Sequence, residues 1–333
     1  IAGVDINVTS SAPGASTAVI IRGMSSLGGS NQPLYIIDGV PIVSRSYHSS
    51  DYLNNYYDFG TGIQMLNPDD IESITVLKST ASSGLYGSRA ANGVILITTK
   101  KGSQGKPVVT INSSFETSDV LRLPEWQNDF GMGWDGHHTF IENGSWGPEF
   151  DGTLRPWGNI YNNSQKIKPF VALPSNVYDF FEYGHKFNNS IEIAGGSEKN
   201  TYRASISYLN EDGIVPKNKD YLKRFTGQLH FTQKMGKLNL TGMALVSRNS
   251  NGFIPTGQSF SVMNNISQIP RDISIVGLRD YETDPFDNLD YYFTPYGVIN
   301  PYYVIDKQIA HAEGQKLISK LELEYNIFDN LNI

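Results

Sequence analysis

The sequence predicts a mainly β protein in two parts, a small mixed α/β domain followed by long antiparallel strands. The 333 residues include 12% aromatic and only 18% charged residues, with 32 glycines, a composition that suits strands and turns. Short apolar runs bounded by turn residues fill residues 1–107, whereas apolar and polar residues alternate from about Val108 onward. The chain has no cysteine, which excludes a disulfide scaffold and a thiolate metal site.

Five short strands and two helical segments are expected within residues 1–107. The strands are Val4–Val8, Ala18–Ile21, Leu34–Ile37, Ile74–Leu77 and Val94–Thr98. Turn residues separate them, including Asp38-Gly39 and Asn92-Gly93. Asn67 is expected to cap a helical turn that has Pro68 at its first position, and a short helix is predicted over Ser79–Ala90.

The second part consists of segments in which every other residue is apolar. In Thr201–Asn210, one face carries Tyr202, Ala204, Ile206 and Tyr208, and the other carries Arg203, Ser205 and Ser207. The same alternation recurs in Arg224–Thr232, Leu238–Ser247 and Leu317–Tyr325. A period of two with one apolar face predicts sheets that have one apolar and one polar side.

Tight and long connections alternate between these segments. The tight ones follow Ile193, Phe231 and Tyr325, and the long ones run roughly over Ser118–Lys186, Asp212–Asp220 and Asn249–Gly314. Outer-membrane barrels have short turns at one end and long loops at the other, whereas structureless loops of this length are unusual in compact soluble domains. The pattern therefore predicts an antiparallel transmembrane β-barrel.

The predicted barrel is incomplete. Val108–Glu116 is the first strand, six strands are complete, and a seventh begins at Leu331. Barrels that hold a plug domain need about 22 strands. We therefore expect a plug domain at residues 1–107, its amino-terminal part missing, and the first strands and extracellular loops of a truncated barrel at residues 108–333.

Four blocks in the first hundred residues resemble the plug domain of SusC/RagA-like TonB-dependent outer-membrane transporters. They are Ile20–Gly23, Pro33–Pro41, Asn67–Lys78 and Leu85–Gly102, in that order. Further on, Gly195–Lys199 with Tyr202, and Asp212-Gly-Ile214, resemble the early barrel of the same family. The long connections show little resemblance.

The resemblance implies active import of a nutrient across the outer membrane of a Gram-negative, Bacteroidetes-type bacterium. A SusD-like lipoprotein lid would capture the substrate, a glycan (oligosaccharide) or a peptide, and TonB would pull on the plug from the periplasm. Outer-membrane lipid would surround the barrel. The resemblance leaves open a dimer of transporter–lipoprotein pairs.

Two arginines in the motif blocks, Arg22 and Arg89, are candidates for contacts between plug and barrel. The carboxylates Glu116, Glu322 and Glu324 lie on polar strand faces, which point into the lumen of such barrels. A buried ion pair is costly to break without being strongly stabilising, which suits a plug that is displaced under force. The alternative is a surface ion pair within the plug.

A tyrosine-rich stretch of the plug is a candidate substrate-facing loop. It contains Tyr47, His48, Tyr52, Tyr56 and Tyr57. Tyrosine-rich polar loops suit adaptable recognition. A loop that merely seals the lumen is an equally favoured alternative.

All four tryptophans, Trp126, Trp134, Trp146 and Trp157, fall in the first long connection. Aromatic faces bind sugar rings, but they also pack loops and mark membrane interfaces. A connection of this length must stay folded, so packing is the favoured role. Trp134 and Trp146 are the candidates for contact with substrate.

Other classes of site find little support. The net charge of −7 argues against nucleic acid, and no set of residues predicts an enzyme. No cofactor is expected: Asp280, Asp284, Asp287 and Asp290 could bind calcium, but their spacing favours a solvated extracellular loop. Two alternative functions remain, a siderophore or vitamin receptor without a lid, and a soluble all-β carbohydrate-binding module.

Overall fold

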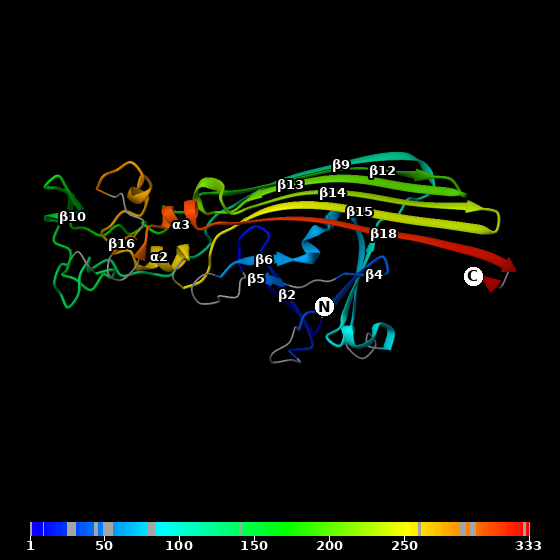
Figure 1. Ribbon diagram of the computed structural model, residues 1–333, viewed down its shortest axis with the longest axis horizontal. Coiled ribbons are helices and arrows are strands. Elements are labelled where there is room, and N and C mark those ends of the chain that lie inside the picture. Colours follow the sequence, from blue (N-terminus) through cyan, green and yellow to red (C-terminus); the bar gives the residue numbers. More distant parts are fainter. Residues whose placement is uncertain are drawn as a thin grey trace.

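A computed structural model describes most of the chain and shows a long sheet, a small domain against one face of that sheet, and a lobe at one end (Figure 1). The described residues are 2–8, 10–24, 31–42, 46–48, 56–78, 84–139, 142–258, 261–286, 291–293, 298–328 and 331–332.

The long sheet has seven strands in the order β19-β18-β15-β14-β13-β12-β9, and all neighbours are antiparallel. The strands are β9 (Gly105–Ser118), β12 (Gly184–Gly196), β13 (Asn200–Asp212), β14 (Tyr221–Met235), β15 (Leu238–Phe253), β18 (Ala310–Phe328) and β19 (Leu331–Asn332). The six strands before β19 have at least 13 residues each, more than the 9–11 or so that span a bilayer. The expectation of six complete strands and a seventh that begins at Leu331 agrees with this sheet.

Burial on this sheet is the reverse of burial in a soluble protein. The face toward the small domain buries polar side chains, among them Ser205, Thr226 and Gln228. The opposite face exposes large apolar side chains: Ile111, Phe115, Ile191, Ile206, Tyr208, Phe225, Leu229, Val246, Leu317, Leu321 and Leu323. Apolar-out, polar-in alternation is the pattern of a transmembrane barrel, so the exposed face is the one that meets lipid. A soluble module would bury that face.

The apolar band has an edge on β18. Leu321 is 66% exposed, and Leu317 and Leu323 lie on the same face. Nearer the lobe, that face carries Gln315 and Glu313 instead. The lipid-facing part of the strand therefore ends between Leu317 and Gln315.

The small domain is the predicted plug, and the five predicted strands are present with small shifts. A hairpin pairs β1 (Val4–Val8) with β2 (Thr17–Ile21), and β5 (Ser46–His48) pairs with β6 (Asp58–Thr61). A four-stranded sheet has the order β4-β3-β8-β7. Its strands are β3 (Leu34–Ile37), β4 (Val40–Ile42), β7 (Ile71–Leu77) and β8 (Val94–Thr99). The three short strands β4, β5 and β6 were not predicted from the sequence.

Local sequence explains the turns and helical segments of the plug. Asp38 and Gly39 both have positive φ, 47° and 87°, and form the two-residue turn between β3 and β4. The expected turn at Asn67 is the 3-10 helix η2 (Pro68–Asp70), and the Asn67 side chain accepts from the backbone N–H of Asp69. Within the predicted helix Ser79–Ala90, the described part ends in a 3-10 turn, η3 (Gly87–Ala90), and residues 79–83 lie outside the described residues.

The plug packs on the polar face of the long sheet, with a small apolar cluster at the contact. Ile37 and Ile97 of the plug share this cluster with Met243, Leu245 and Ile318 of the sheet. We call the seven-stranded sheet the strand wall. Short turns connect its strands at one end: residues 197–199 between β12 and β13, and Gly236-Lys237 between β14 and β15. Long connections gather at the other end (Figure 1).

The long connections form a folded lobe. The sequence predicted that the first of them stays folded, but it did not predict the helices and strands of the lobe. The lobe contains β10 (Leu154–Tyr161), β11 (Ser164–Pro169), η4 (Pro216–Asn218), α2 (Val262–Gln268), η5 (Val276–Leu278), β16 (Tyr291–Phe293), β17 (Val298–Ile299) and α3 (Pro301–Lys307). Its core joins Phe180 of the first long connection to Ile266, Ile273 and Tyr302 of another. These apolar residues follow no regular period in the sequence, so the pattern did not reveal their shared core.

A buried aspartate connects separate segments of the lobe. The Asp272 carboxylate accepts from the backbone N–H of Met132 at 2.8 Å and from the Lys168 ammonium. These contacts join residues from the two longest connections. Within the described part of the chain, no helix is long and apolar enough to span a membrane.

Arginine in place of Leu321 should impair insertion of the full-length protein, because a charge at the centre of the lipid-facing band costs about 2–4 kcal/mol in a membrane barrel. Gln315→Arg is the matched control: it lies on the same face of β18 but beyond the apolar band, where the cost is about 0–1 kcal/mol. The measurement is the heat-modifiable, folded fraction in the outer membrane. Equal folded fractions for the two variants would contradict the assignment of this face to lipid.

Candidate functional site

The candidate site is the contact between plug and strand wall, and its centre is a buried ion pair. Arg203 on β13 donates from Nη2 to Asp70 Oδ1 at 2.7 Å, and each side chain is only 2% exposed. Ser205 donates to the same oxygen at 2.7 Å. The guanidinium also pairs with Glu192 on β12, with Nε to Oε2 at 3.1 Å. We call Asp70, Arg203 and Glu192 the latch.

A chain of hydrogen bonds extends the latch across the plug. Arg203 Nη1 donates to Gln228 Oε1 at 2.9 Å, and Gln228 Nε2 donates to Thr99 Oγ1 at 2.7 Å. Thr99 in turn donates from its hydroxyl to Asp38 Oδ2 at 2.6 Å. A side chain of the wall is thus connected through two neighbours to the β3–β4 turn. Such chains of buried polar groups fix a single relative position, because each displaced group loses its partner.

The short sequence Asn67-Pro68-Asp69-Asp70 explains why two carboxylates reach the wall. The capped 3-10 turn places Asp69 and Asp70 side by side at the start of β7. Asp69 accepts from Ser190 of β12 at 2.8 Å, while Asp70 meets β13. The backbone carbonyl of Asp70 accepts from the N–H of Lys100 at 2.9 Å, which ties the turn to the end of β8.

A third wall strand binds the segment just before this turn. Arg224 on β14 donates from Nη1 to the carbonyl oxygen of Gln64 at 2.6 Å. Gln64 Nε2 donates onward to the carbonyl oxygens of Gly14 and Ala15 at 2.6 and 2.7 Å. The β1–β2 hairpin is therefore connected to the wall through a second plug residue, whereas the η2 turn contacts the wall directly.

The two arginines predicted from the motif blocks do not make these contacts, which is a correction for the strands that this chain contains. Arg22 and Arg89 are exposed, and neither takes part in the ion pairs formed among the described residues. Arg22 occupies a left-handed turn just after β2, with φ of 62°, and Arg89 lies on the exposed η3 turn. Neither arginine therefore holds the plug to the strands of this chain.

The predicted carboxylates do lie on the inward face, but they contact the wall itself. Glu116 pairs with Lys186 at 3.4 Å, and Glu322 pairs with Lys320 at 2.8 Å. Glu324 accepts from Asn239 at 3.4 Å. The sequence did contain a signal for the true partner, because Arg203 sits on the polar side of an alternating strand.

The tyrosine-rich stretch is only partly described, and its described part contacts the long connections of the lobe. Tyr52 and the side chains of Tyr47 and His48 lie outside the described residues. The Tyr57 hydroxyl is buried and donates to the carbonyl oxygen of Gln308 at 2.7 Å. The carbonyl of Tyr56 accepts from the N–H of Thr256 at 2.8 Å.

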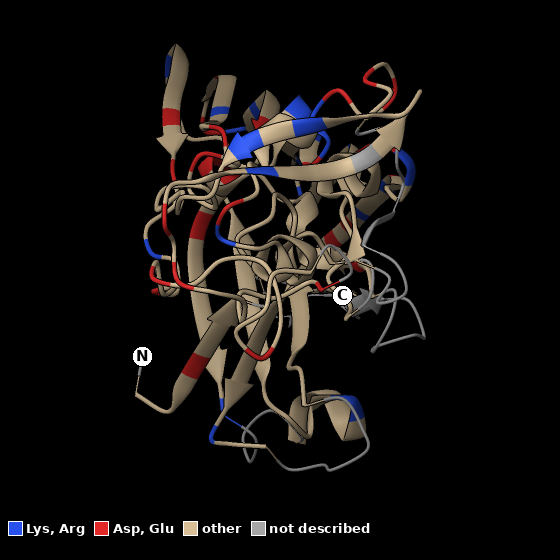
Figure 2. Ribbon diagram, turned by 90° about the vertical axis from the view of Figure 1, so that its left-hand side faces the viewer, with Lys and Arg blue, Asp and Glu red and all other residues tan. Residues whose placement is uncertain are grey.

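The lobe displays two of its four tryptophans. Trp134 is 59% exposed and Trp146 is 70% exposed, whereas Trp157 is buried and Trp126 is half-buried. Backbone hydrogen bonds join the two turns that carry the exposed tryptophans. The Trp146 N–H donates to the carbonyl oxygen of Gly133 at 3.1 Å, and the Gly136 N–H donates to the carbonyl oxygen of Trp146 at 3.0 Å. Both signs of charge are distributed over this end of the molecule (Figure 2).

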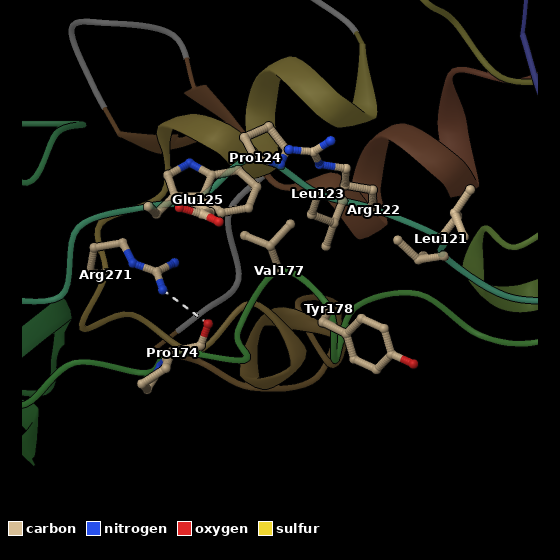
Figure 3. Close-up of a pocket in the computed structure, with 11 residues that line it drawn as sticks. Leu121, Arg122, Leu123, Pro124, Glu125, Pro174, Val177, Tyr178 and Arg271 are labelled. Carbon is tan, nitrogen blue, oxygen red and sulfur yellow. Dashed lines mark hydrogen bonds between the residues drawn. The ribbon is translucent and has the colours of Figure 1, made fainter.

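A cavity of about 480 Å³ opens near the root of the first long connection (Figure 3). Val177 points toward the segment that carries Leu123, and Trp126 lines the same cavity. Arg271 at its edge donates from Nη2 to the carbonyl oxygen of Pro174 at 3.1 Å and from Nε to that of Gln127 at 3.1 Å. Arg271 thus holds the lobe segments around the cavity together.

Only two of the four acidic residues that could bind calcium, Asp280 and Asp284, lie within the described residues. Asp284 pairs with Lys166 at 2.6 Å, and Asp287 and Asp290 lie outside the described residues. Within the described ranges, no group of three His, Asp or Glu side chains could hold a metal ion.

Asp220, in the connection before β14, is a buried carboxylic acid. It is 3% exposed, and its Oδ1 has no hydrogen-bond partner among the described residues. Burial raises the pKa of Asp220 to about 7, although hydrogen bonds from its own and the Val215 backbone oppose that shift. A Cβ at Gly213 would lie only 1.8 Å from Asp220 Oδ2, so glycine is required there.

Comparisons with known proteins relate the chain to TonB-dependent receptors. Residues 1–94 match the model of the TonB-dependent Receptor Plug Domain. The chain is 32% identical to the TonB-dependent receptor SusC of Bacteroides thetaiotaomicron over 231 residues, which are 69% of this chain and 20% of that protein. It is 29% identical to the TonB-dependent receptor P26 of Formosa agariphila over 295 residues, 86% of this chain and 26% of that protein.

A solved structure shares the fold over the whole chain. The structure of the RagAB peptide importer in the open-open state matches with a TM-score of 0.68 at 22% identity, covering 100% of this chain and 36% of that chain. The chain therefore spans about a fifth to a third of the length of the proteins it matches.

Alanine at Arg203 should loosen the plug, because it leaves the buried carboxylate of Asp70 without its cation. Breaking one partner of a buried pair costs about 3–5 kcal/mol. The measurement is the urea concentration at which limited proteolysis first cuts the plug of the full-length protein. Arg22→Ala and Arg89→Ala are the controls and should change this midpoint little. A lower midpoint for the controls than for Arg203→Ala would overturn the assignment of the latch.

The stability that Asp220 contributes should depend on pH. A carboxyl whose pKa is raised by folding is best tolerated when protonated, so its contribution is fully present below the usual pKa and is lost as pH rises through about 7. Asp220→Asn should therefore stabilise the full-length protein at pH 8, by about 1–3 kcal/mol. The gain should shrink steadily as the pH falls and should largely vanish near pH 4, where Asp220 is protonated in the folded protein and mostly neutral in the unfolded one. Thermal unfolding in detergent at both pH values gives the comparison, and a gain independent of pH would contradict the buried-acid interpretation.

Proposed function

The chain belongs to the SusC/RagA-like TonB-dependent transporters, and on that premise we propose that the full-length protein imports a nutrient across the bacterial outer membrane. The observation that carries the proposal is a folded plug held on the polar, inward face of a strand wall whose outward face is apolar. A closed plug on such a face is the resting state of a gated channel. No bond need be made or broken, so the protein acts as a transporter rather than as an enzyme.

In the proposed mechanism, TonB pulls on the plug from the periplasm and displaces part of it. The contacts with the wall would decide which part moves. The η2 turn is held on the wall by a buried ion pair and by Ser190 and Ser205. The hydrogen bonds that connect the β1–β2 hairpin to the wall run through the neutral amide of Gln64, and the Asp58 carboxylate that binds Ser16 belongs to the plug itself. Neutral hydrogen bonds contribute about 0.5–1.5 kcal/mol each, so the hairpin is the part that yields first.

We propose that the lobe faces the outside and works with a SusD-like lipoprotein that delivers a glycan or a peptide. The lobe lies at the end of the long connections, which is the extracellular end of an outer-membrane barrel. Its exposed pair, Trp134 and Trp146, offers adjoining aromatic faces for a substrate. The buried Tyr57 has the sealing role instead.

The test is uptake by cells that express the full-length transporter together with the lipoprotein encoded beside it. The probes are a fluorescent oligosaccharide mixture and a fluorescent peptide mixture. One of them should enter, and deletion of either gene, deletion of TonB or addition of a protonophore should abolish entry. Import of a ferric siderophore without the lipoprotein would replace the proposal with the siderophore alternative, and entry that is insensitive to the protonophore would overturn it.

The same assay tests the exposed tryptophans. Replacing Trp134 and Trp146 together by alanine should raise the concentration for half-maximal uptake about tenfold, since a ring contact is worth about 0.5–1.5 kcal/mol. Trp157→Phe, a conservative change at a buried ring, is the matched control. An unchanged half-maximal concentration in the double variant would remove these rings from the substrate path.

A further inference from the structure

Cavities of unequal size lie between the plug and the strand wall in the described part of the chain. Their volumes are about 530, 460 and 190 Å³. The largest lies beside the β1–β2 hairpin, and the smallest lies beside the β3–β4 turn, where Asp38 and Thr98 of the plug face Thr241 and Met243 of the wall. The plug therefore leaves more room against the wall beside the hairpin than beside the β3–β4 turn.

The two sides of the largest cavity differ in chemistry. The plug side consists mainly of small side chains on the segment Ser10–Ala15, which we call the loose segment. The wall side carries two carboxylates and two cations: Glu116, Lys186, Glu211 and Arg224. Because the positive and negative charges balance, the wall side selects neither for cations nor for anions. It favours water and polar solutes in general.

Unpartnered polar groups on the wall also line this cavity. Arg224 is 8% exposed, yet its Nε has no hydrogen-bond partner among the described residues. The Oδ1 of Asn188 is buried and has no partner within the same ranges. Buried polar groups are almost always satisfied, by water where protein provides no partner. The wall is therefore prepared for water or a polar solute in this cavity.

The loose segment touches the wall without hydrogen bonds to it. Gly14 lies against Asn251 of β15, and Pro13 is buried. In the described structure, however, no hydrogen bond joins residues 10–15 to the strand wall, and Gly14 and Ala15 are held by Gln64, which belongs to the plug. The η2 turn next to the cavity is bound directly to β12 and β13 through Asp69 and Asp70. A pull on the hairpin can thus enlarge this cavity while the latch keeps the rest of the plug in place.

We propose that the imported solute passes the plug through this cavity, between the loose segment and the wall formed by β9, β12, β13 and β14. The inference rests on the proposed function and specifies its route. Arg224 is the charged group of the wall that meets the solute once the loose segment has moved. The latch side of the plug stays bound throughout transport.

The experiment locks the route with a reducible cross-link in the full-length transporter. This chain contains no cysteine, and any cysteine in the rest of the full-length protein is first replaced by serine, so that the pair Ser11→Cys with Asn188→Cys can be joined selectively across the cavity by a dithio-bismaleimide. The matched control pair is Thr98→Cys with Thr241→Cys, across the smallest cavity. Mass spectrometry confirms each link. Uptake of the oligosaccharide and peptide mixtures is then measured before linking, after linking and after reduction.

Linking residues 11 and 188 should abolish uptake, and reduction should restore it, whereas linking residues 98 and 241 should leave uptake at the level before linking. Loss of uptake with both links would mean that the plug leaves as one body, which overturns the proposal. Retained uptake with the first link, or loss with the second alone, would overturn it as well.

A second measurement separates this inference from the proposed function. The full-length variants are placed in planar bilayers in potassium chloride, and periplasmic-side urea loosens the plug without unfolding the barrel. The first conductance step should vanish with the link between residues 11 and 188 and persist with the control link. That result would support the route even if neither mixture is imported. A first step that survives the link would overturn the route even if import is confirmed.

Discussion

The inward face of the strand wall is polar and covered, and the rest of the structure depends on satisfying that face. In water its side chains would be hydrated, but the plug removes water from Arg203, Ser205 and Gln228. Each must then find a partner, because an unsatisfied buried donor or acceptor costs about 1–3 kcal/mol. The plug supplies Asp70 and Thr99 at those places. The plug is thus positioned by hydrogen-bond geometry more than by apolar packing, which is confined to one cluster.

The outward face follows from the same alternation. A strand with a period of two cannot place a polar residue inward without placing its neighbours outward. The arginine of the latch, Arg203, is therefore flanked by Tyr202 and Ala204, and the exposed Ile206 follows on their face. The residues that hold the plug and the residues that meet lipid are consequently set by a single register, and a slip of one residue would exchange them.

The sequence allowed prediction of the wall and most of the plug, but not of the contact between them. Alternation identifies the faces of a strand, and turn residues such as Asp38-Gly39 mark local reversals. Neither signal shows which residues come into contact when they are far apart in the sequence, as Asp70 and Arg203 are, at a separation of 133 positions. The motif arginines Arg22 and Arg89 attracted attention because they lie in recognisable blocks, yet both are exposed. The lobe was missed for a related reason: its core residues come from separate connections and share no period.

A polar contact also explains how a plug can be firmly placed and still be released. An apolar interface resists separation because its whole area meets water when it opens. Hydrogen bonds are exchanged for bonds to water, so their net contribution is small once water can enter. Breaking the latch costs much free energy only while water is excluded from it. The cost of separating Arg203 from Asp70 comes from the low dielectric around the two side chains. The cavity beside the loose segment is lined by Pro68 and Arg224 but not by Asp70 or Arg203. Water that enters when the loose segment moves therefore reaches the hairpin side first, while the latch stays dry and keeps the rest of the plug in place. The order in which contacts open is thus set by the arrangement of the plug's polar partners.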